Sequence, residues 1–248
     1  MSFENKVVIV TGAGGGIGEG YAKRFAEEGM CVVIAELDEI KGNAVAADIV
    51  AQGGKAIAVK TDVADDASCA ACAAAAVEAF GGIDYLVNNA AIFDGMRREG
   101  YLDVDLDYLE LFMRVNAHGC LLMTRAVVPF MEQRGGGAIV NQSSIAAWMN
   151  MGFYGVAKLT MNGITCSLAK ELGPRNIRIN AIASGPTDTP ALRNTLGDYA
   201  DQMVQSIPMG RLGTPGDMAE SVLFLLSDKA AWITGLIMNV DGGHQMRV

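Results

Sequence analysis

Residues 6–18 read KVVIVTGAGGGIG, in which a β-branched run, Lys6 to Thr11, passes directly into a glycine-rich turn. The next segment, Ile17 to Glu28, has helical spacing of its apolar residues. Glycines permit a tight turn and a close backbone approach to a pyrophosphate, and a following helix N-terminus offers N–H groups with partial positive charge. This strand–turn–helix predicts a nucleotide site formed by Gly12, Gly15, Gly16, Ile17 and Gly18.

The same alternation continues to the end of the chain. Strand-like runs are expected at Lys6–Thr11, Cys31–Ala35, Lys55–Lys60, Asp84–Val87, Ala138–Asn141, Arg178–Ala183 and Leu236–Val240. Helical patterns are expected at Ile17–Glu28, Glu39–Ala51, Asp65–Phe80, about Asp105–Arg134, about Met151–Leu172 and Asp217–Ser227. Strands that alternate with helices predict an α/β fold, a doubly wound parallel sheet with helices on both faces. We expect one domain over residues 1–248, with ligands bound beyond the carboxyl ends of the strands.

The composition excludes several classes of protein. The chain has 248 residues, of which 51% are hydrophobic and 19% charged, too apolar for a disordered chain. Its net charge of −9 repels phosphate backbones and anionic lipid, so no nucleic-acid or membrane partner is expected. No apolar run approaches the roughly 20 residues of a membrane helix. The polar N-terminus, which runs at once into a strand, does not resemble a signal peptide.

The five cysteines are scattered through apolar or alanine-rich stretches. Cys69 and Cys72 form a CxxC spacing, the one arrangement that could suggest metal or redox chemistry. Because no second Cys or His pair lies nearby, we interpret both as structural residues of a small-residue helix and expect no metal. Scattered thiols are typical of a reducing, cytoplasmic protein.

The second predicted strand ends at Glu36, which bears on the choice of cofactor. A carboxylate at this place can accept hydrogen bonds from both adenosine ribose hydroxyls and repels a 2′-phosphate. Neither Gly15 in the turn nor Leu37 after the acid supplies the cation that an NADP site needs. We therefore predict NAD(H). The rival acid, Asp38, is better placed as a helix N-cap.

Two further strand ends carry candidate cofactor contacts. Asp62 and Val63 follow the third strand, and Asp62 either holds the adenine amino group or caps the helix that starts near Asp65; we favour the adenine contact. The fourth strand ends in Asn88-Asn89-Ala90-Ala91. Asparagine amides there can tie neighbouring strands together, while small alanines let a cofactor pass the backbone. Asn89 and Ala90 are the residues that we expect beside the cofactor.

The chemistry is expected where the fifth strand leads into the next helix. Tyr154 and Lys158 are four residues apart, so they share one helix face. A phenol has a pKa of about 10, and a nearby ammonium favours the phenolate. Tyr154 could then exchange a proton with a substrate oxygen, which Ser144, at the strand end, could also hydrogen-bond. The pair on its own is common and usually structural, but its place after a nucleotide turn favours catalysis.

The set of TGAGGGIG (Thr11–Gly18), NNAA (Asn88–Ala91), SS (Ser143-Ser144), YGVAK (Tyr154–Lys158) and NVDGG (Asn239–Gly243) resembles the short-chain dehydrogenase/reductase family over the whole chain. The resemblance implies a seven-stranded Rossmann-type sheet, one domain per subunit and usually a homotetramer. It implies that Tyr154 is the catalytic acid/base, that Lys158 lowers its pKa and holds the nicotinamide ribose, and that Ser144 orients the substrate. Asn116 matches the family's helix asparagine, which supports a water-mediated proton relay to the lysine.

Three departures from the family pattern stand out. Ala91 replaces a usual glycine, which adds a methyl group near the cofactor. Ser184 replaces the proline of a Pro-Gly pair, although Gly185, Thr187 and Thr189 remain to meet the carboxamide. The stretch from Ser144 to Tyr154 is shorter than usual by a few residues, so the substrate loop there should be trimmed.

The substrate end is rich in large apolar residues. Residues 145–153 read IAAWMNMGF, and Phe93, Met96 and Leu192 follow other strands. An apolar pocket favours a hydrophobic or alicyclic secondary alcohol and its ketone. Trp148 could instead pack at a subunit interface. Arg97 and Arg98 could meet a carboxylate or thioester headgroup or be merely solvated.

Three functions follow in order of preference. The first is an NAD(H)-dependent oxidoreductase that interconverts a secondary alcohol and its ketone. The second is a 3-oxoacyl-thioester reductase of the acyl-carrier-protein type, for which NADPH and a basic entry surface are expected. The third is a non-catalytic nucleotide-binding sensor, against which the complete set of Asn116, Ser144, Tyr154 and Lys158 argues.

Overall fold

The computed structural model describes residues 3–246. Its centre is a parallel sheet of seven strands in the order β3-β2-β1-β4-β5-β6-β7, as predicted. The strands are β1 (Val7–Thr11), β2 (Cys31–Glu36), β3 (Lys55–Lys60), β4 (Tyr85–Asn88), β5 (Gly137–Ser144), β6 (Ile177–Ser184) and β7 (Ile237–Val240). The strand order reverses between β1 and β4, which is where such sheets open a crevice for ligands.

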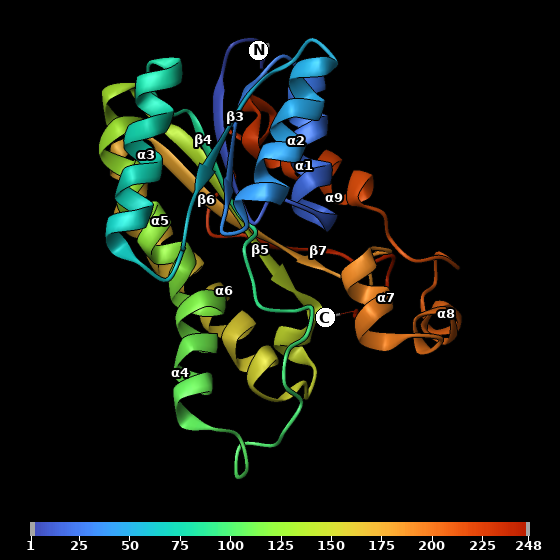
Figure 1. Ribbon diagram of the computed structural model, residues 1–248. Helices are drawn as coiled ribbons and strands as arrows, with labels where there is room; N and C mark the ends of the chain where they lie inside the picture. The colour runs from blue at the N-terminus through green and yellow to red at the C-terminus, as the bar shows by residue number, and fades with distance from the viewer. Residues whose placement is uncertain (1–2, 247–248) are drawn as a thin grey trace.

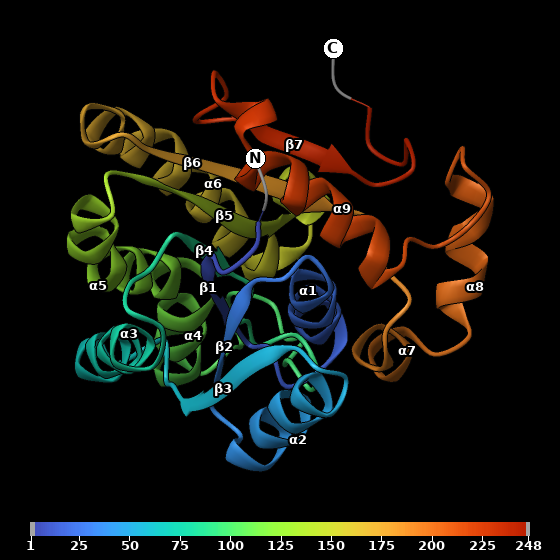
Figure 2. The same cartoon turned by 90° about the horizontal axis from the view of Figure 1, so that it is seen from above.

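Helices cover both faces of the sheet, as Figure 2 shows. One face carries α1 (Gly16–Glu27), α2 (Glu39–Ala51) and α9 (Pro215–Leu226). The other carries α3 (Asp66–Phe80), α5 (Gly119–Gln133) and α6 (Gly152–Leu172). Alternate residues of β1 serve the two cores: Val8 packs with Tyr21 and Phe25, and Ile9 packs with Met123. Both faces of the inner strands are therefore buried, which explains why these strands read as continuous apolar runs, whereas the edge strands β3 and β7 are only partly buried.

The helix predicted over about Asp105–Arg134 is not uniform. It consists of α4 (Leu106–Met113), a π-helical segment (Arg114–His118) and α5. A π segment inserts extra residues into a helix and is frequent at functional sites. The predicted site residue Asn116 lies within it.

Two short helices, α7 (Pro190–Leu196) and α8 (Tyr199–Met203), have no counterpart among the predicted elements. Their apolar residues, among them Leu192 and Ala200, form a small cluster with Ile207 and Leu212. Strands β5 and β6 are also longer than predicted and end at Ser144 and Ser184. The polar residues at their ends therefore belong to the sheet.

Two local predictions are confirmed: Asp38 caps a helix, and the CxxC cysteines lie in one. Asp38 caps α2, accepting hydrogen bonds from the amides of Ile40 (3.0 Å) and Lys41 (3.2 Å). Cys69 and Cys72 both belong to α3 and are buried in the core. Within residues 3–246 no cluster of three or more His, Cys, Asp or Glu side chains could hold a metal ion. Over the same residues no helix is both long and apolar enough to span a bilayer.

Candidate active site

A cavity of about 1120 Å³ opens at the carboxyl ends of the strands. Its walls come from the turn after β1, the loop after β4, the start of α6 and the segment around α7, which lie at one end of the sheet in Figure 1. Sites for a single drug-sized molecule are usually about 300–1,000 Å³, so this one has room for a dinucleotide and a second molecule. Every predicted site residue lines the cavity except Gly18 and Asn116.

The glycine turn is shaped by close backbone approaches. Gly12 has a φ of +62°, and a Cβ there would lie 2.7 Å from the Ala90 Cα. At Gly18 a Cβ would overlap the Gly12 carbonyl oxygen, so this glycine lets α1 pack against the turn and does not face the cavity. The Asn89 side-chain amide fixes the turn by donating to the carbonyls of Thr11 (3.0 Å) and Gly12 (2.9 Å).

Glu36 stands at the end of β2 beside the same turn. Its Oε2 accepts a hydrogen bond of 2.9 Å from the Gly14 amide, so the carboxylate is held at the lip of the cavity. The structure also places Lys41 on the wall at this corner, 3.8 Å from the Asp38 carboxylate. The sequence did not indicate that Lys41 lines the cavity, because nothing in the pattern of the first helical turns shows which side this residue faces.

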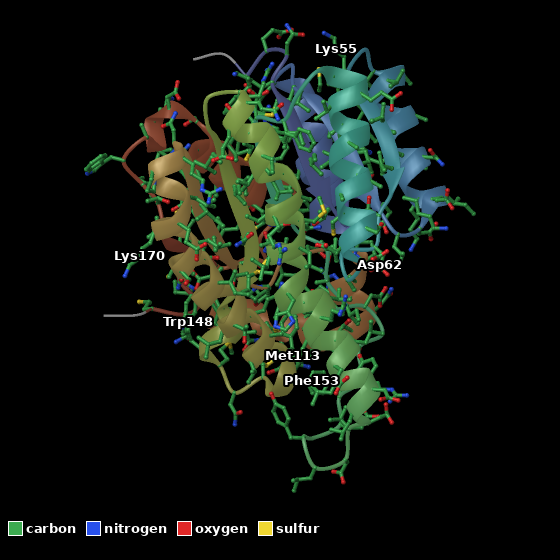
Figure 3. The ribbon with its side chains drawn as sticks, turned by 90° about the vertical axis from the view of Figure 1, so that its left-hand side faces the viewer. Lys55, Asp62, Met113, Trp148, Phe153 and Lys170 are labelled. Carbon is green, nitrogen blue, oxygen red and sulfur yellow. The ribbon has the colours of Figure 1, made fainter. Side chains whose placement is uncertain are left out.

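Asp62 and Val63 line the cavity beyond Glu36, and Figure 3 shows Asp62 at the end of α3. Asp62 Oδ1 accepts from the Ala64 amide (2.8 Å) and stabilises the turn after β3. The N-cap of α3 is Asp65, which accepts from the Ala67 amide at 3.2 Å. Asp65 therefore provides the helix cap, which was one of the two roles considered for Asp62.

Asparagine side chains tie the sheet together under the cavity, as expected from the NNAA stretch. The Asn88 side-chain amide donates to Asn141 Oδ1 across the β4–β5 pair at 2.8 Å. The Ala90 amide donates to Thr11 Oγ1 at 3.0 Å. The extra methyl of Ala91 is accommodated because that residue is exposed at the cavity wall.

Ser144, Tyr154 and Lys158 meet where β5 passes into α6. The Ser144 and Tyr154 side chains are hydrogen-bonded. Lys158 is only 2% exposed, and its ammonium lies 5.8 Å from the centre of the Tyr154 ring. The ammonium donates a hydrogen bond of 2.8 Å to the Gln142 main-chain carbonyl.

The electrostatics of this pair differ from the expectation that Lys158 lowers the phenol pKa. Burial raises the pKa of Tyr154 to about 12, although the hydrogen bond with Ser144 acts in the opposite direction. Burial also lowers the pKa of Lys158 to about 8. The physical reason is desolvation, which disfavours the charged form of both groups and outweighs their mutual attraction while the ammonium is directed at Gln142.

Asn116 occupies a different place from the other predicted catalytic residues. Its side chain is fully buried in the π segment and makes two hydrogen bonds with the backbone of Ile92. Oδ1 accepts from the Ile92 amide (2.7 Å), and Nδ2 donates to the Ile92 carbonyl (2.9 Å). In this arrangement the amide holds the loop after β4 and does not face the cavity.

The turn after β6 forms another part of the cavity wall. A Cβ on Gly185 would lie 2.7 Å from the Asp241 Cα, so only glycine fits there. Thr187 Oγ1 donates to the Gly185 carbonyl (3.0 Å), and Thr189 Oγ1 accepts from the Leu192 amide (3.2 Å), capping α7. Both threonines line the cavity.

The far end of the cavity is apolar. Phe93, Met96 and Leu192 line it as predicted, and the Phe93 and Tyr154 ring centroids are 5.5 Å apart. Three more methionines, Met149, Met151 and Met203, complete the wall.

Most residues of the expected substrate loop line the cavity, and Phe153 among them also packs into the core beside it. Phe153 packs mainly against Phe112, at 4.8 Å, near Met113 in Figure 3. Trp148 does not line the cavity. At the rim, Arg97 stacks on Tyr108, 4.8 Å from the ring centroid, and Arg98 donates to the Thr195 carbonyl.

Comparison with known proteins places this site among oxidoreductases. A family model described as enoyl-(acyl carrier protein) reductase matches residues 12–245. An uncharacterised oxidoreductase from Mycobacterium tuberculosis is 56% identical over 246 residues, which cover 99% of both chains.

Two solved structures are closely similar. A 7α-hydroxysteroid dehydrogenase in complex with NADH and 7-oxoglycochenodeoxycholic acid has a TM-score of 0.91 and 35% identity, covering 97% of this chain and 94% of that one. A 3-ketoacyl-(acyl-carrier-protein) reductase from Brucella melitensis, in complex with NADH, has a TM-score of 0.90 and 37% identity, covering 99% and 100%.

Proposed function

Because the chain belongs to the short-chain dehydrogenase/reductase family of oxidoreductases, we propose that it uses NAD(H) to interconvert a secondary alcohol and its ketone. The observation that carries this proposal is the group of Ser144, Tyr154 and Lys158 on the wall of a cavity with room for two molecules. The dinucleotide would lie along the glycine turn, Glu36, Asp62 and Val63 at one end and Gly185, Thr187 and Thr189 at the other.

The wall of the cavity fits such a cofactor. At Gly12 the turn after β1 passes so close to Ala90 that no side chain fits there. The N-terminus of α1 follows the turn directly, and its N–H groups can bind a pyrophosphate. Glu36 is held where it can accept from ribose hydroxyls, which favours NAD(H) over NADP(H). When bound, NAD(H) supplies the acceptor or donor of the hydride.

In the proposed mechanism Tyr154 exchanges the proton. Since burial raises its pKa to about 12, Tyr154 is a neutral phenol near pH 7 and can donate a hydrogen bond and then a proton to a ketone oxygen. Ser144 would hold that oxygen. For the reverse reaction the phenol must lose its proton, and the Lys158 ammonium, one helical turn away, favours that loss once it is no longer held by the Gln142 carbonyl.

The substrate is proposed to be hydrophobic, with an alicyclic alcohol as the first candidate. Phe93, Leu192 and four methionines form the wall beside Tyr154. Methionine side chains are flexible and adapt to irregular apolar shapes, which suits a bulky ring system. A similar protein acts on a hydroxysteroid, a ring substrate of this kind.

A 3-oxoacyl-thioester reductase is the second candidate, favoured by the similar ketoacyl reductase. Its expected preference for NADPH does not separate the two candidates, because that relative was solved with NADH. The substrate does separate them: an acyl thioester would place its headgroup near Arg97 and Arg98 at the rim.

The test is a panel of substrates with NAD+ or NADH, followed by the change in NADH absorbance. We expect turnover of cyclic secondary alcohols or their ketones to exceed that of 3-oxoacyl thioesters by at least about tenfold in kcat/KM. The opposite ranking would favour the second candidate. No turnover of any member by a protein that binds NADH would favour a sensor and contradict the proposal.

Three further parts of the prediction stay proposals. We propose that residues 1–248 act as one domain, that the protein assembles as a homotetramer and that it acts in the cytoplasm. The scattered cysteines support the last point, and size-exclusion chromatography with light scattering would test the second.

A further inference from the structure

Gln142 is a buried polar residue near the end of β5, on the wall of the cavity. It is 6% exposed on β5 and lies on the face of the sheet that carries α1. A buried amide is costly unless its donors and acceptor are hydrogen-bonded. The hydrogen-bond partners of Gln142 therefore indicate its role.

The Gln142 side chain is the centre of a chain of hydrogen bonds. The Tyr21 hydroxyl, fully buried on α1, donates to Gln142 Oε1. Gln142 Nε2 donates to Ser184 Oγ at 2.8 Å, and Ser184 Oγ donates to the Ser143 carbonyl at 3.4 Å. Gln142 pairs with Ile182 in the sheet, so Ser184, two residues on, faces the same side and comes within reach.

The main chain of Gln142 reaches the other side of the site. Its carbonyl oxygen accepts the hydrogen bond from the Lys158 ammonium. One residue thus contacts both the ammonium beside Tyr154 and Ser184, the residue before Gly185. Gly185 begins the turn to which we assign the nicotinamide end of the cofactor.

Position 184 is where the family pattern has a proline. Proline restricts φ to about −65° and so stiffens the backbone before the turn. Serine does not, but a buried network whose members are all hydrogen-bonded also restrains its backbone. Tyr21 and Gln142 hold the Ser184 side chain in such a network.

We propose that Gln142, oriented by Tyr21, is a positioning residue that holds the turn at Ser184–Gly185 in the place of the missing proline and so sets the affinity for the cofactor. The inference rests on the proposed function, because it needs a nicotinamide cofactor at this turn. None of the three side chains is assigned a contact with the reacting atoms. Their effect is therefore expected in cofactor binding and not in proton transfer.

The test measures NADH affinity of the full chain by fluorescence titration for Tyr21→Phe, Ser184→Ala and the double variant. Loss of one buried hydrogen bond is expected to weaken NADH binding roughly three- to tenfold in each single variant. The double variant should bind about as weakly as either single variant, because both changes break the same chain. The matched control is Tyr85→Phe, which removes a hydroxyl from the start of β4, outside the cavity.

A second experiment tests whether a proline at position 184 compensates for the loss of the Tyr21 hydroxyl. In a Ser184→Pro background the proline restrains the turn directly, so Tyr21→Phe should no longer change NADH affinity. Unchanged NADH affinity in Tyr21→Phe, or losses that add in the double variant, would overturn the proposal even if both variants are less stable. If Ser184→Pro does not fold, the Tyr21→Phe and Ser184→Ala cycle decides alone.

Failure of this inference is distinguishable from failure of the proposed function. Wild-type protein that binds no NADH and turns over no alcohol would contradict the proposed function. Wild-type protein that does both, with variants that bind NADH equally well, would contradict the role of Gln142 alone.

Discussion

The Lys158 ammonium lies 5.8 Å from the centre of the Tyr154 ring, yet its hydrogen bond goes to the Gln142 carbonyl. In this arrangement the half-buried phenol keeps its proton, since burial raises its pKa to about 12. The site is therefore set for an acid that donates to a substrate oxygen. Redirecting the ammonium is the simplest change that would let the phenol act as a base.

The first prediction concerns the Tyr154 hydroxyl. Tyr154→Phe removes the proton donor and should lower kcat by roughly 10²- to 10⁴-fold, the usual contribution of general acid–base catalysis. NADH affinity should change by no more than about twofold. The exposed Tyr199→Phe serves as the control and should leave both quantities unchanged. A Tyr154→Phe variant with full activity would overturn the assignment of the acid.

The second prediction uses the buried ammonium and its pH dependence. Burial lowers the pKa of Lys158 from its ordinary value near 10.5 to about 8. Between these values the unfolded chain holds a proton that the folded chain has released, so this group makes the free energy of unfolding rise with pH. Lys158→Met lacks the group and should lack this rise.

Urea denaturation at about pH 7.5 and 9.5 measures the effect. The free energy of unfolding of the wild type, minus that of Lys158→Met, should increase between the two pH values, because other groups cancel in the difference. A difference that is flat or falls with pH would show that the ammonium is not desolvated.

The third prediction concerns cofactor choice at the lip of the cavity. Glu36→Ala removes the carboxylate that repels a 2′-phosphate and leaves Lys41 on the same wall as a cation. NADH should bind roughly tenfold more weakly and NADPH more tightly than to the wild type. Adding Lys41→Met should cancel the gain for NADPH but not the loss for NADH. An unchanged ratio of the two affinities in Glu36→Ala would contradict the role given to this carboxylate.

The parts of the fold that the sequence predicts are those set by local patterns. β-Branched runs and the glycine turn identify the strands and the cofactor end, because strand propensity and positive φ at Gly12 act over a few residues. The two helices after β6 were missed, because segments of seven and five residues are too short for helical periodicity and depend on tertiary contacts. The π segment around Asn116 escaped detection since apolar spacing does not show a local change of helical pitch.

Long-range polar contacts could not be predicted from the sequence for a different reason. Gln142 reads as an unremarkable polar residue at a strand end, and its partners Tyr21 and Ser184 lie 121 and 42 positions away. The sheet register brings Ser184 to Gln142, and the packing of α1 on the sheet brings Tyr21 to it. The hydrogen bond from Lys158 to the Gln142 carbonyl is hidden in the same way, because it involves a main-chain atom that every residue carries.

The fourth prediction concerns two contacts that join the loop after β4 to α7 across the mouth of the cavity. Arg98 donates to the Thr195 carbonyl, and the Asn194 side chain donates to Asp94 Oδ2 at 3.3 Å. Both contacts are exposed, so they contribute little to global stability, but they limit how far α7 moves from the apolar wall.

Arg98→Met should therefore raise the KM for an apolar alcohol several-fold while the melting temperature changes little. Backbone hydrogen exchange over residues 190–203 should become faster, because α7 loses a tie to the rest of the cavity. Arg97→Met is the matched control, because Arg97 is the neighbouring residue and stacks on Tyr108 of α4. Equal effects of the two substitutions would mean that positive charge at the rim matters and the contact does not, and unchanged exchange in Arg98→Met would show that α7 is held by its apolar cluster alone.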